Sequence, residues 1–189
     1  MEREEKIEAI QRQLFGNEYV GATLAKISLP GASAGDVTNW LKNPKHILLM
    51  TGPVGTGKTY FCSAVLERMF GKVQHCRAHK EGSLFRRLRQ GFSENSAGDY
   101  LTHLKGLIDD EFIIIDDVGS TGHTDWREEI LMEAIDYRYT SGLPTLITSN
   151  LSRKQFYEIY NTRIGSRLFA KRNTIIDLEG MPDLRQVYD

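Results

Sequence analysis

The sequence has little of what marks secreted, membrane-spanning or strongly charged proteins. Its two cysteines, Cys62 and Cys76, are too few for a disulfide framework. No apolar run approaches the roughly 18 residues that a membrane-spanning helix needs, and no signal-peptide pattern opens the chain. The 24 basic and 25 acidic residues nearly cancel, so the net charge of -1 does not by itself attract nucleic acid. We therefore expect a cytoplasmic protein without membrane contact, in which any site for a polyanion is a local patch.

The 189 residues suit one compact domain and leave no room for a second full one. A structural zinc site in that domain would need four ligands at a recognisable spacing. His75, Cys76 and His79 stand close together, but a fourth ligand is missing. The sequence therefore does not favour a metal held by cysteine and histidine.

A glycine-rich stretch, Gly52–Thr59, is the strongest signal in the chain. It reads Gly-Pro-Val-Gly-Thr-Gly-Lys-Thr and fits the phosphate-binding pattern G-x-x-x-x-G-K-[ST] at every fixed position. The apolar run 46–50 before it predicts a buried strand, and residues 60–70 after it have apolar residues at helical spacing. Strand, glycine loop and helix are the order that a nucleotide site requires. The alternative, a glycine-rich turn with a chance lysine, does not explain this order.

The residue types of the loop predict its chemistry. Glycines let backbone N–H groups close round a polyphosphate, Lys58 reaches the outer phosphates, and the Thr59 hydroxyl can ligate magnesium. We therefore expect ATP and Mg²⁺ as cofactors. The predicted nucleotide-binding residues are Gly52, Pro53, Val54, Gly55, Thr56, Gly57, Lys58, Thr59 and Tyr60.

Two carboxylates end a second apolar run. Residues 112–115 are four consecutive large apolar residues, typical of a strand buried on both faces, and Asp116 and Asp117 follow. In a phosphate-loop fold, the acid at the end of this strand meets the magnesium held by Thr59, which predicts a metal ligand at Asp116. Asp117 is then placed to orient or deprotonate an attacking water. The alternative is a strand that ends in solvated acids at a sheet edge.

A third strand, predicted over 145–148, leads into Ser149 and Asn150. Ligands of open α/β sheets bind at the carboxyl ends of the strands, so Asn150 could hold the water or the terminal phosphate. The alternative is that Asn150 is an ordinary turn residue. Further elements are predicted as follows: strands over 72–78 and 173–178, helices over 33–41, 83–90, 125–140 and 152–160, a short helix with residues 163–168, a loop over 93–99, and helix caps at Asp125 and Ser152.

The predicted helix over 83–90 lies in a locally basic stretch. Between Lys72 and Gln90 there are six basic residues and one acid, Glu81. Arg86 and Arg87 could follow nucleic-acid phosphates, and Phe85 could stack on a base. A solvated helix face is the alternative.

The first fourteen residues predict a charged surface helix with a narrow apolar stripe, Ile7, Ile10 and Leu14. Such a stripe can pack on its own domain or fill a groove on a partner protein. We therefore divide the chain into an N-terminal helix and lead-in, 1–44, and a nucleotide-binding domain, 45–189.

Together these residues resemble the AAA+ ATPases, in particular the branch of the DnaC and DnaI replicative helicase loaders and the IstB transposition ATPases. The resemblance covers most of residues 45–185 and rests on the glycine loop, on Ile-Ile-Asp-Asp-Val-Gly, and on the run from Arg138 to Leu151. It implies a P-loop NTPase of the AAA+ class, a three-layer α/β/α fold with a mostly parallel central sheet and no C-terminal helical lid. Arg185 could weakly replace the second sensor of such a lid.

The resemblance also implies roles for individual residues. Asn150 matches the first sensor, and Arg167 matches the arginine finger that completes a neighbouring subunit's site, with Arg163 as the weaker candidate. It implies self-association through Arg167 and single-stranded DNA contacts near Phe85. The loaders usually have a sizeable N-terminal domain that grips the helicase, whereas about forty residues precede the first core strand here.

The function expected from these motifs is an ATP-dependent helicase loader in DNA replication that hydrolyses ATP slowly until it assembles or meets DNA. Its partners would be a replicative helicase and single-stranded DNA. An IstB-like transposition ATPase is the nearest alternative. A helicase-binding adaptor that does not hydrolyse ATP is an alternative from a different functional class. A small-molecule kinase is also possible, but it would need neither Arg167 acting on a neighbouring subunit nor the Thr-Ser-Asn run at 148–150.

Overall fold

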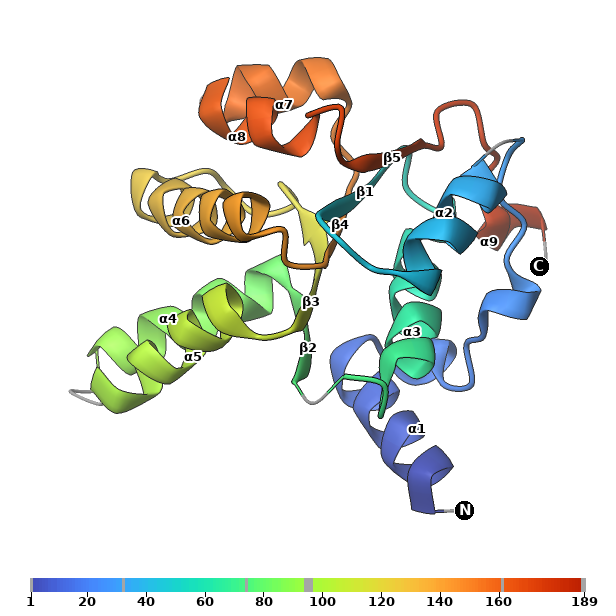
Figure 1. The fold of residues 1–189 in the computed structure, drawn as a ribbon, viewed down its shortest axis with the longest axis horizontal. Coiled ribbons are helices and arrows are strands. Elements are labelled where there is room, and N and C mark those ends of the chain that lie inside the picture. Colours follow the sequence, from blue (N-terminus) through green and yellow to red (C-terminus); the bar gives the residue numbers. More distant parts are fainter. Residues whose placement is uncertain (1, 32, 74, 94–96, 161, 188–189) are drawn as a thin grey trace.

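The structure is a computed structural model that describes residues 2–187 apart from 32, 74, 94–96 and 161. Helices and strands alternate through most of the chain (Figure 1). The elements are α1 (Glu2–Leu14), η1 (Asn17–Tyr19), η2 (Leu24–Lys26), α2 (Ser33–Lys42), β1 (Ile47–Thr51), α3 (Lys58–Met69), β2 (Cys76–Lys80), α4 (Glu81–Ser93), α5 (Ala97–Asp109), β3 (Phe112–Val118), α6 (Asp125–Ser141), β4 (Thr145–Ser149), α7 (Arg153–Ile159), α8 (Thr162–Leu168), β5 (Thr174–Asp177) and α9 (Leu184–Val187).

The five strands form one parallel sheet in the order β2-β3-β4-β1-β5. The strand that feeds the glycine loop, β1, pairs with β4 and β5, and β3 pairs with β2 and β4. Because all strands run the same way, their carboxyl ends meet at one edge of the sheet. The residues predicted for the nucleotide site follow β1 and β4 or lie in the last part of β3, at this edge.

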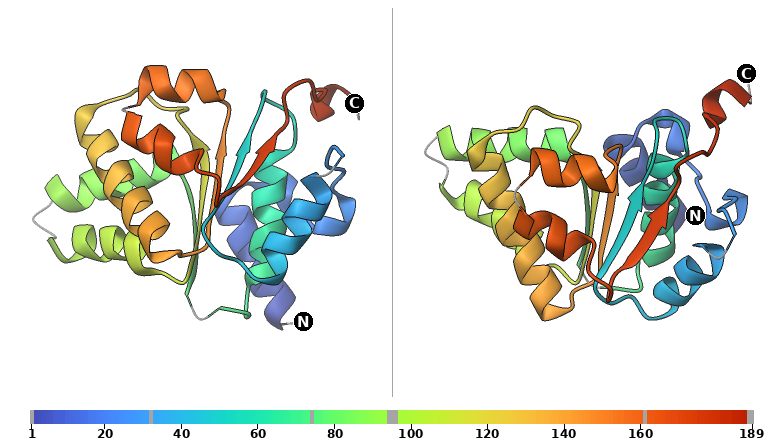
Figure 2. Two further views of the ribbon diagram at one scale, coloured as in Figure 1. Left: turned by 45° about the horizontal axis from the view of Figure 1, so that its top comes forward. Right: turned by 90° about the horizontal axis from the view of Figure 1, so that it is seen from above.

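Alternate side chains of the strands build two separate cores, one on each face of the sheet. Leu48 and Met50 pack with Trp40 of α2 and with the apolar side of α3, whereas Ile47 and Leu49 pack with α4 to α8. Figures 1 and 2 show α1, α2 and α3 on one face and α4 to α8 on the other. The predicted three-layer α/β/α fold with a parallel sheet is confirmed.

The N-terminal helix packs on its own domain. Ile7 is buried, and Ile10 and Leu14 lie against the core on the α3 side of the sheet. Gln11 is fully buried, and its amide donates to the carbonyls of Ser63 in α3 and Ala22. Of the two alternatives for this stripe, the structure supports packing on its own domain, because the stripe covers apolar surface of the domain rather than facing a partner.

The region between β1 and β3 differs most from the sequence prediction. β2 begins four residues later than predicted, and α4 is longer than the helix expected over 83–90. A further helix, α5, begins at Ala97, inside the stretch 93–99 that was predicted as a loop, of which 94–96 lie outside the described residues. Two glycines weaken the helical signal of α5, but Gly106 has a packing reason: a Cβ there would lie 2.6 Å from the Arg77 guanidinium.

Helix caps were predicted with mixed success. Ser152 forms the expected capping box with Gln155, in which each side chain hydrogen-bonds to the other residue's backbone N–H. The cap of α6 is Thr124, whose hydroxyl accepts from the backbone N–H of Arg127, so the prediction of Asp125 is wrong by one residue. Asp125 is instead the first helical residue, where its charge favours the positive end of the helix dipole.

Candidate nucleotide-binding site

The glycine loop joins β1 to α3 at the carboxyl edge of the sheet. Gly55 and Gly57 have φ angles of 83° and 89°, in the left-handed region that other residues adopt at a cost. Gly57 caps α3, so the loop leads directly into the positive end of that helix. This is the local geometry in which backbone N–H groups receive a phosphate.

Lys58 begins α3 and turns back into the loop. Its ammonium group donates to the carbonyls of Gly52 at 2.7 Å and Pro53 at 2.6 Å, and only 6% of the residue is exposed. Burial lowers the pKa of Lys58, while the carboxylates of Asp117 and Asp116 raise it. The two carbonyls that Lys58 contacts are neutral, so a bound polyanion would form stronger hydrogen bonds with the ammonium group than these carbonyls do.

Asp116, at the end of β3, meets two hydroxyl groups. Thr148 of β4 donates to one carboxylate oxygen at 2.6 Å, and Thr59 of α3 donates to the other at 3.1 Å. Burial raises the pKa of Asp116, and these two hydrogen bonds oppose the rise. The carboxylate of Asp116 and the hydroxyl of Thr59 thus face each other, and both are the hard oxygen ligands that Mg²⁺ prefers. The donor set fits the predicted magnesium ion.

Asp117 has an unusual backbone conformation. Its φ of 65° is rare for a residue other than glycine, and the pairing of β3 with β4 shifts register between Ile115 and Val118. The Asp117 N–H donates to the Thr148 hydroxyl at 3.0 Å, and the Asn150 amide donates to the Asp117 carboxylate at 2.8 Å. The irregular backbone allows both consecutive acids to reach the same cleft, which regular alternation would prevent.

Beyond the loop lies a cleft of about 900 Å³, and the predicted residues Lys58, Thr59, Asp116, Asp117 and Asn150 all line it. Its outer walls come from segments far apart in the chain. Residues 18–19 and 26–29 lie before α2, and Leu178, Met181, Leu184 and Arg185 follow β5.

Tyr19 and Arg185 come from segments far apart in the chain and both line this cleft. Burial raises the pKa of Tyr19, and Arg185 lowers it. Below them, Ile27, Leu29 and Met181 give the cleft an apolar lining, while the phosphate loop is polar. A cleft that is polar at one end and apolar at the other suits a nucleotide, because phosphates and a base need opposite environments.

Comparison with known proteins agrees with this geometry. Residues 34–166 match the family described as IstB-like ATP binding protein. The chain belongs to this family. A relative of this chain is a putative ATP-binding protein in an insertion sequence of Mycobacterium tuberculosis. It is 29% identical over 139 residues, which cover 72% of this chain and 53% of that protein. This IstB-like chain spans about half the length of the curated relatives it matches.

Solved structures share the fold. The crystal structure of the DnaC helicase loader superposes with a TM-score of 0.70 at 20% identity, over 85% of this chain and 98% of that one. DnaI gives a TM-score of 0.69 at 22% identity, over 93% and 99%. The family match confirms the predicted resemblance to the IstB ATPases, and these structures confirm the fold that IstB proteins were expected to share with DnaC and DnaI. Within the described part of the chain, no helix has both the length and the apolar character needed to cross a membrane.

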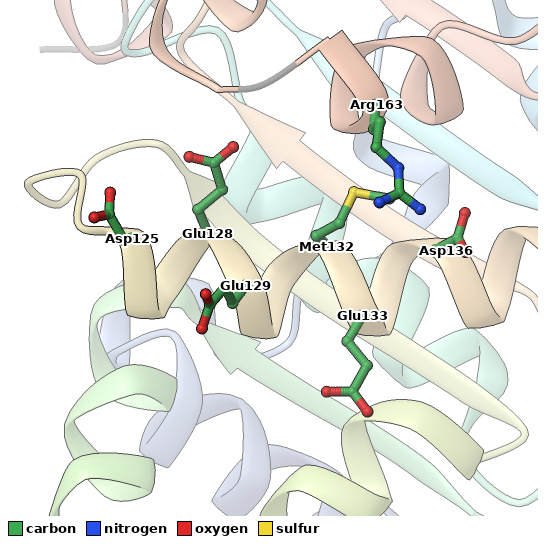
Figure 3. A pocket seen from close by; sticks show the side chains of 7 residues that line it. All are labelled: Asp125, Glu128, Glu129, Met132, Glu133, Asp136 and Arg163. Carbon is green, nitrogen blue, oxygen red and sulfur yellow. The ribbon is translucent and has the colours of Figure 1, made fainter.

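The two arginines predicted for a neighbouring subunit's site lie on α8, and neither lines the cleft. Arg167 forms an ion pair with Asp136 of α6 at 2.6 Å, and its guanidinium lies 5.2 Å from the centre of the Tyr139 ring. Figure 3 shows Arg163 pointing from α8 toward α6, near Met132 and Asp136. Arg167 therefore contacts an acidic helix of its own chain, and Arg163 points toward the same helix.

The basic helix differs from its predicted role. Phe85 is 2% exposed and packs with Trp126 in the core, so the prediction that it stacks on a base is wrong. Arg87 is half-buried and donates to the ring nitrogen of His79, whose pKa burial and Arg87 lower to about 3. Arg86 and Arg89 are exposed and remain candidates for phosphate contacts.

Sequence reasoning missed several residues of the site. Thr148 belongs to the Thr-Ser-Asn run, but nothing local shows that its hydroxyl joins both acids of β3. Cys62 lies fully buried with its sulfur 3.6 Å from Asp116. Tyr19 and Met181 carry no motif, and only the fold brings them to the cleft.

Proposed function

We propose that this protein is a magnesium-dependent ATPase that loads or remodels a replicative helicase on DNA. One observation carries the hydrolytic part: two consecutive carboxylates, Asp116 and Asp117, enter one cleft and hydrogen-bond to different partners there. Asp116 faces Thr59, and Asp117 faces Asn150. This arrangement supports separate roles in metal binding and in water activation.

The glycine loop, Lys58, Thr59 and Asp116 would bind Mg-ATP. The loop N–H groups and Lys58 hold the phosphates, and Thr59 and Asp116 hold magnesium. The bound ion would neutralise the charge that grows on the phosphate oxygens during hydrolysis. The apolar end of the cleft, with Ile27 and Met181, would receive the base.

Asp117 and Asn150 would act in hydrolysis. Water adds to the terminal phosphorus, the bond from that phosphorus to the bridging oxygen breaks, and Asp117 accepts the proton that the water loses. The hydrogen bond from Asn150 orients the Asp117 carboxylate. Asp117 replaces the longer glutamate often found in this role, so the reach of its side chain is one methylene shorter.

Assembly is expected to complete the site. Arg167 does not line the cleft of its own chain, which is consistent with action on a neighbouring subunit. To act there, Arg167 must break its ion pair with Asp136. We therefore expect the isolated protein to hydrolyse ATP slowly. An arginine supplied in this way contributes about 10³ to 10⁵ in rate in related nucleotidases.

The experiment for ATP use compares wild type with Lys58→Ala and Asp117→Asn. We expect Lys58→Ala to lose ATP binding and Asp117→Asn to bind ATP but to lose hydrolysis. Isothermal titration measures the first and phosphate release the second. Unchanged ATP affinity in folded Lys58→Ala would overturn the assignment, and wild type that binds ATP but never releases phosphate would favour the adaptor alternative.

The helicase-loading role is supported by the likeness to DnaC and DnaI, although that likeness is one of fold. The relative from an insertion sequence favours the second candidate, an IstB-like ATPase in transposition. Either role would place the protein in the cytoplasm, beside DNA. A small-molecule kinase remains less suited, because it would not use Arg167 in trans.

Capture experiments separate the two candidates. The purified protein with ATP is offered a replicative helicase from the same genome and, in parallel, the transposase encoded nearest to its own gene. Retention of the helicase, followed by helicase-dependent unwinding of single-strand-gapped DNA, supports loading. Retention of the transposase without the helicase supports the transposition role.

A further inference from the structure

Glu81 is a buried acid that the scheme above does not use. It follows Lys80 at the carboxyl end of β2 and begins α4. Its exposed fraction is 2%. Burying a carboxylate is costly unless hydrogen bonds satisfy it, so its partners indicate what it does.

Those partners come from two other segments. One carboxylate oxygen accepts from the Gly119 N–H at 3.1 Å and from the Tyr160 hydroxyl at 3.3 Å, and the other accepts from the Thr121 hydroxyl at 2.7 Å. Burial and Glu81 itself raise the pKa of Tyr160, so this hydroxyl stays protonated and remains a donor. Glu81 thereby joins the start of α4 to the turn after β3 and to the end of α7.

The turn that Glu81 holds contains the proposed water-activating residue. Gly119 lies two residues after Asp117, and the N–H of Ser120 donates to the Asp117 carbonyl at 3.2 Å. Asp117 and Gly119 both have left-handed backbone angles, with φ of 65° and 85°. Such a turn persists only where its surroundings hold it.

Two anchors hold this turn from opposite sides. On the β4 side, Thr148 and Asn150 bind Asp117. On the α4 side, Glu81 binds the Gly119 N–H. Glu81 is not among the residues that line the cleft, and its bond to Gly119 connects it to Asp117 through this turn.

We propose that Glu81 is a positioning residue that sets where the Asp117 carboxylate lies over the nucleotide. The inference rests on the proposed function to the extent that Asp117 activates water. It adds that the acid at the start of α4 fixes the rate of hydrolysis without taking part in nucleotide binding.

The test uses three variants of the full chain: Glu81→Ala, Glu81→Gln and Tyr160→Phe. Glu81→Ala leaves the Gly119 N–H without its acceptor. Glu81→Gln keeps an oxygen for that N–H, and the Thr121 hydroxyl can rotate to accept from the new amide. Tyr160→Phe removes one donor and keeps the bond between Glu81 and Gly119. Binding of Mg-ATP, turnover at saturating ATP and hydrogen exchange at Gly119 are measured for each.

We expect Glu81→Ala to bind Mg-ATP within about twofold of wild type but to turn over about tenfold more slowly, with faster exchange at Gly119. Glu81→Gln should restore both turnover and exchange to within about threefold of wild type, as should Tyr160→Phe. Wild-type turnover and exchange in folded Glu81→Ala would overturn the proposal. So would a parallel loss of affinity and turnover in all three variants, because that pattern indicates a structural role.

Failure of the proposed function gives a different result. If wild type never hydrolyses ATP, water activation by Asp117 is refuted, yet exchange at Gly119 still tests the anchor. Faster exchange in Glu81→Ala than in Glu81→Gln supports positioning of the turn, and equal exchange in both refutes it.

Discussion

The hydroxyl of Thr148 donates to the buried carboxylate of Asp116 at 2.6 Å. The Thr148 hydroxyl oxygen also accepts a hydrogen bond from the backbone N–H of Asp117, at 3.0 Å. One hydroxyl on β4 therefore fixes both acids of β3, the proposed metal ligand and the proposed water-activating residue.

Thr148→Val should weaken hydrolysis more than Thr148→Ser does. Valine has the shape of threonine but leaves the Asp117 N–H unpaired and takes a donor from Asp116, which costs about 1–3 kcal/mol at a buried site. Turnover should therefore fall about tenfold or more in Thr148→Val. Serine keeps the hydroxyl and should stay close to wild type. Phosphate release at several magnesium concentrations measures the effect, and equal rates in both variants would contradict it.

Asp116→Asn should make the protein more stable at neutral pH while it abolishes magnesium-dependent ATP hydrolysis. The pKa of Asp116 is raised by burial, so its charged form is less favourable in the folded than in the unfolded chain. Stability from this group is therefore full below the ordinary pKa of 3.8 and is lost as pH rises through the raised value.

The neutral amide avoids that loss. We expect the Tm of Asp116→Asn to exceed that of wild type at pH 7, and the gain to vanish below the ordinary pKa of 3.8. Calorimetry without nucleotide across this range tests the sign. A variant that is less stable at pH 7 would show that the hydrogen bonds from Thr59 and Thr148 outweigh burial.

Arg167→Ala and Asp136→Asn should have different effects on the stimulated ATPase rate. Arg167→Ala removes the proposed finger, so the rate reached on assembly should fall about 10³-fold or more while ATP affinity is kept. Asp136→Asn keeps Arg167 and weakens only the pair that holds it on its own chain. That variant should match or exceed the wild-type rate.

The matched pair separates the two explanations for Arg167. If both variants lose activity equally, Arg167 acts through packing of α8 on α6. Mixing Arg167→Ala with Asp117→Asn subunits gives a second readout, because each can supply what the other lacks. A mixture that stays inactive in every assembly would remove the support for action in trans.

Ile7→Ala should destabilise the domain by about 2 kcal/mol or more, because Ile7 is buried in α1. Glu8→Ala, at the exposed next position, is the control and should change stability by less than about 0.5 kcal/mol. Urea unfolding measures both. Equal stability of the two variants would mean that α1 detaches in solution and is again available to a partner.

Arg86→Ala combined with Arg89→Ala should reduce affinity for single-stranded DNA and lower its dependence on salt. Each phosphate contact contributes about 0.7 to the salt slope for single strands. Glu81, Phe85 and Arg87 are left unchanged, since their contacts lie inside the domain. Fluorescence anisotropy at several salt concentrations measures the slope. An unchanged slope would move the DNA site away from α4.

The parts of the site that could be predicted from sequence are those whose chemistry is local. Gly57, Lys58 and Thr59 are consecutive, and Asp116 and Asp117 end one apolar run, so the pattern itself carries their meaning. Phe85 was misread for a physical reason: an aromatic among arginines has the composition of a DNA site, but helical geometry turns it to the core beside Leu84 and Leu88.

Other features depend on contacts between distant segments. Glu81 is one acid in a basic stretch, and nothing nearby shows that its partners lie at Gly119 and Tyr160. The apolar stripe with Ile7 is equally compatible with self-packing and with a partner until Gln11 is seen bonded to Ser63. Sequence patterns give the period of a helix face but not what covers it.

Tyr19 and Arg185 line the same cleft, and this affects how the chain would respond to nucleotide. Residues near both termini line one cleft, so a bound nucleotide would touch the beginning, the middle and the end of the sequence at once. Ligand binding would then protect both ends of the chain together against proteases. Truncation at either end would appear first as weaker ATP binding, well before the sheet itself unfolds.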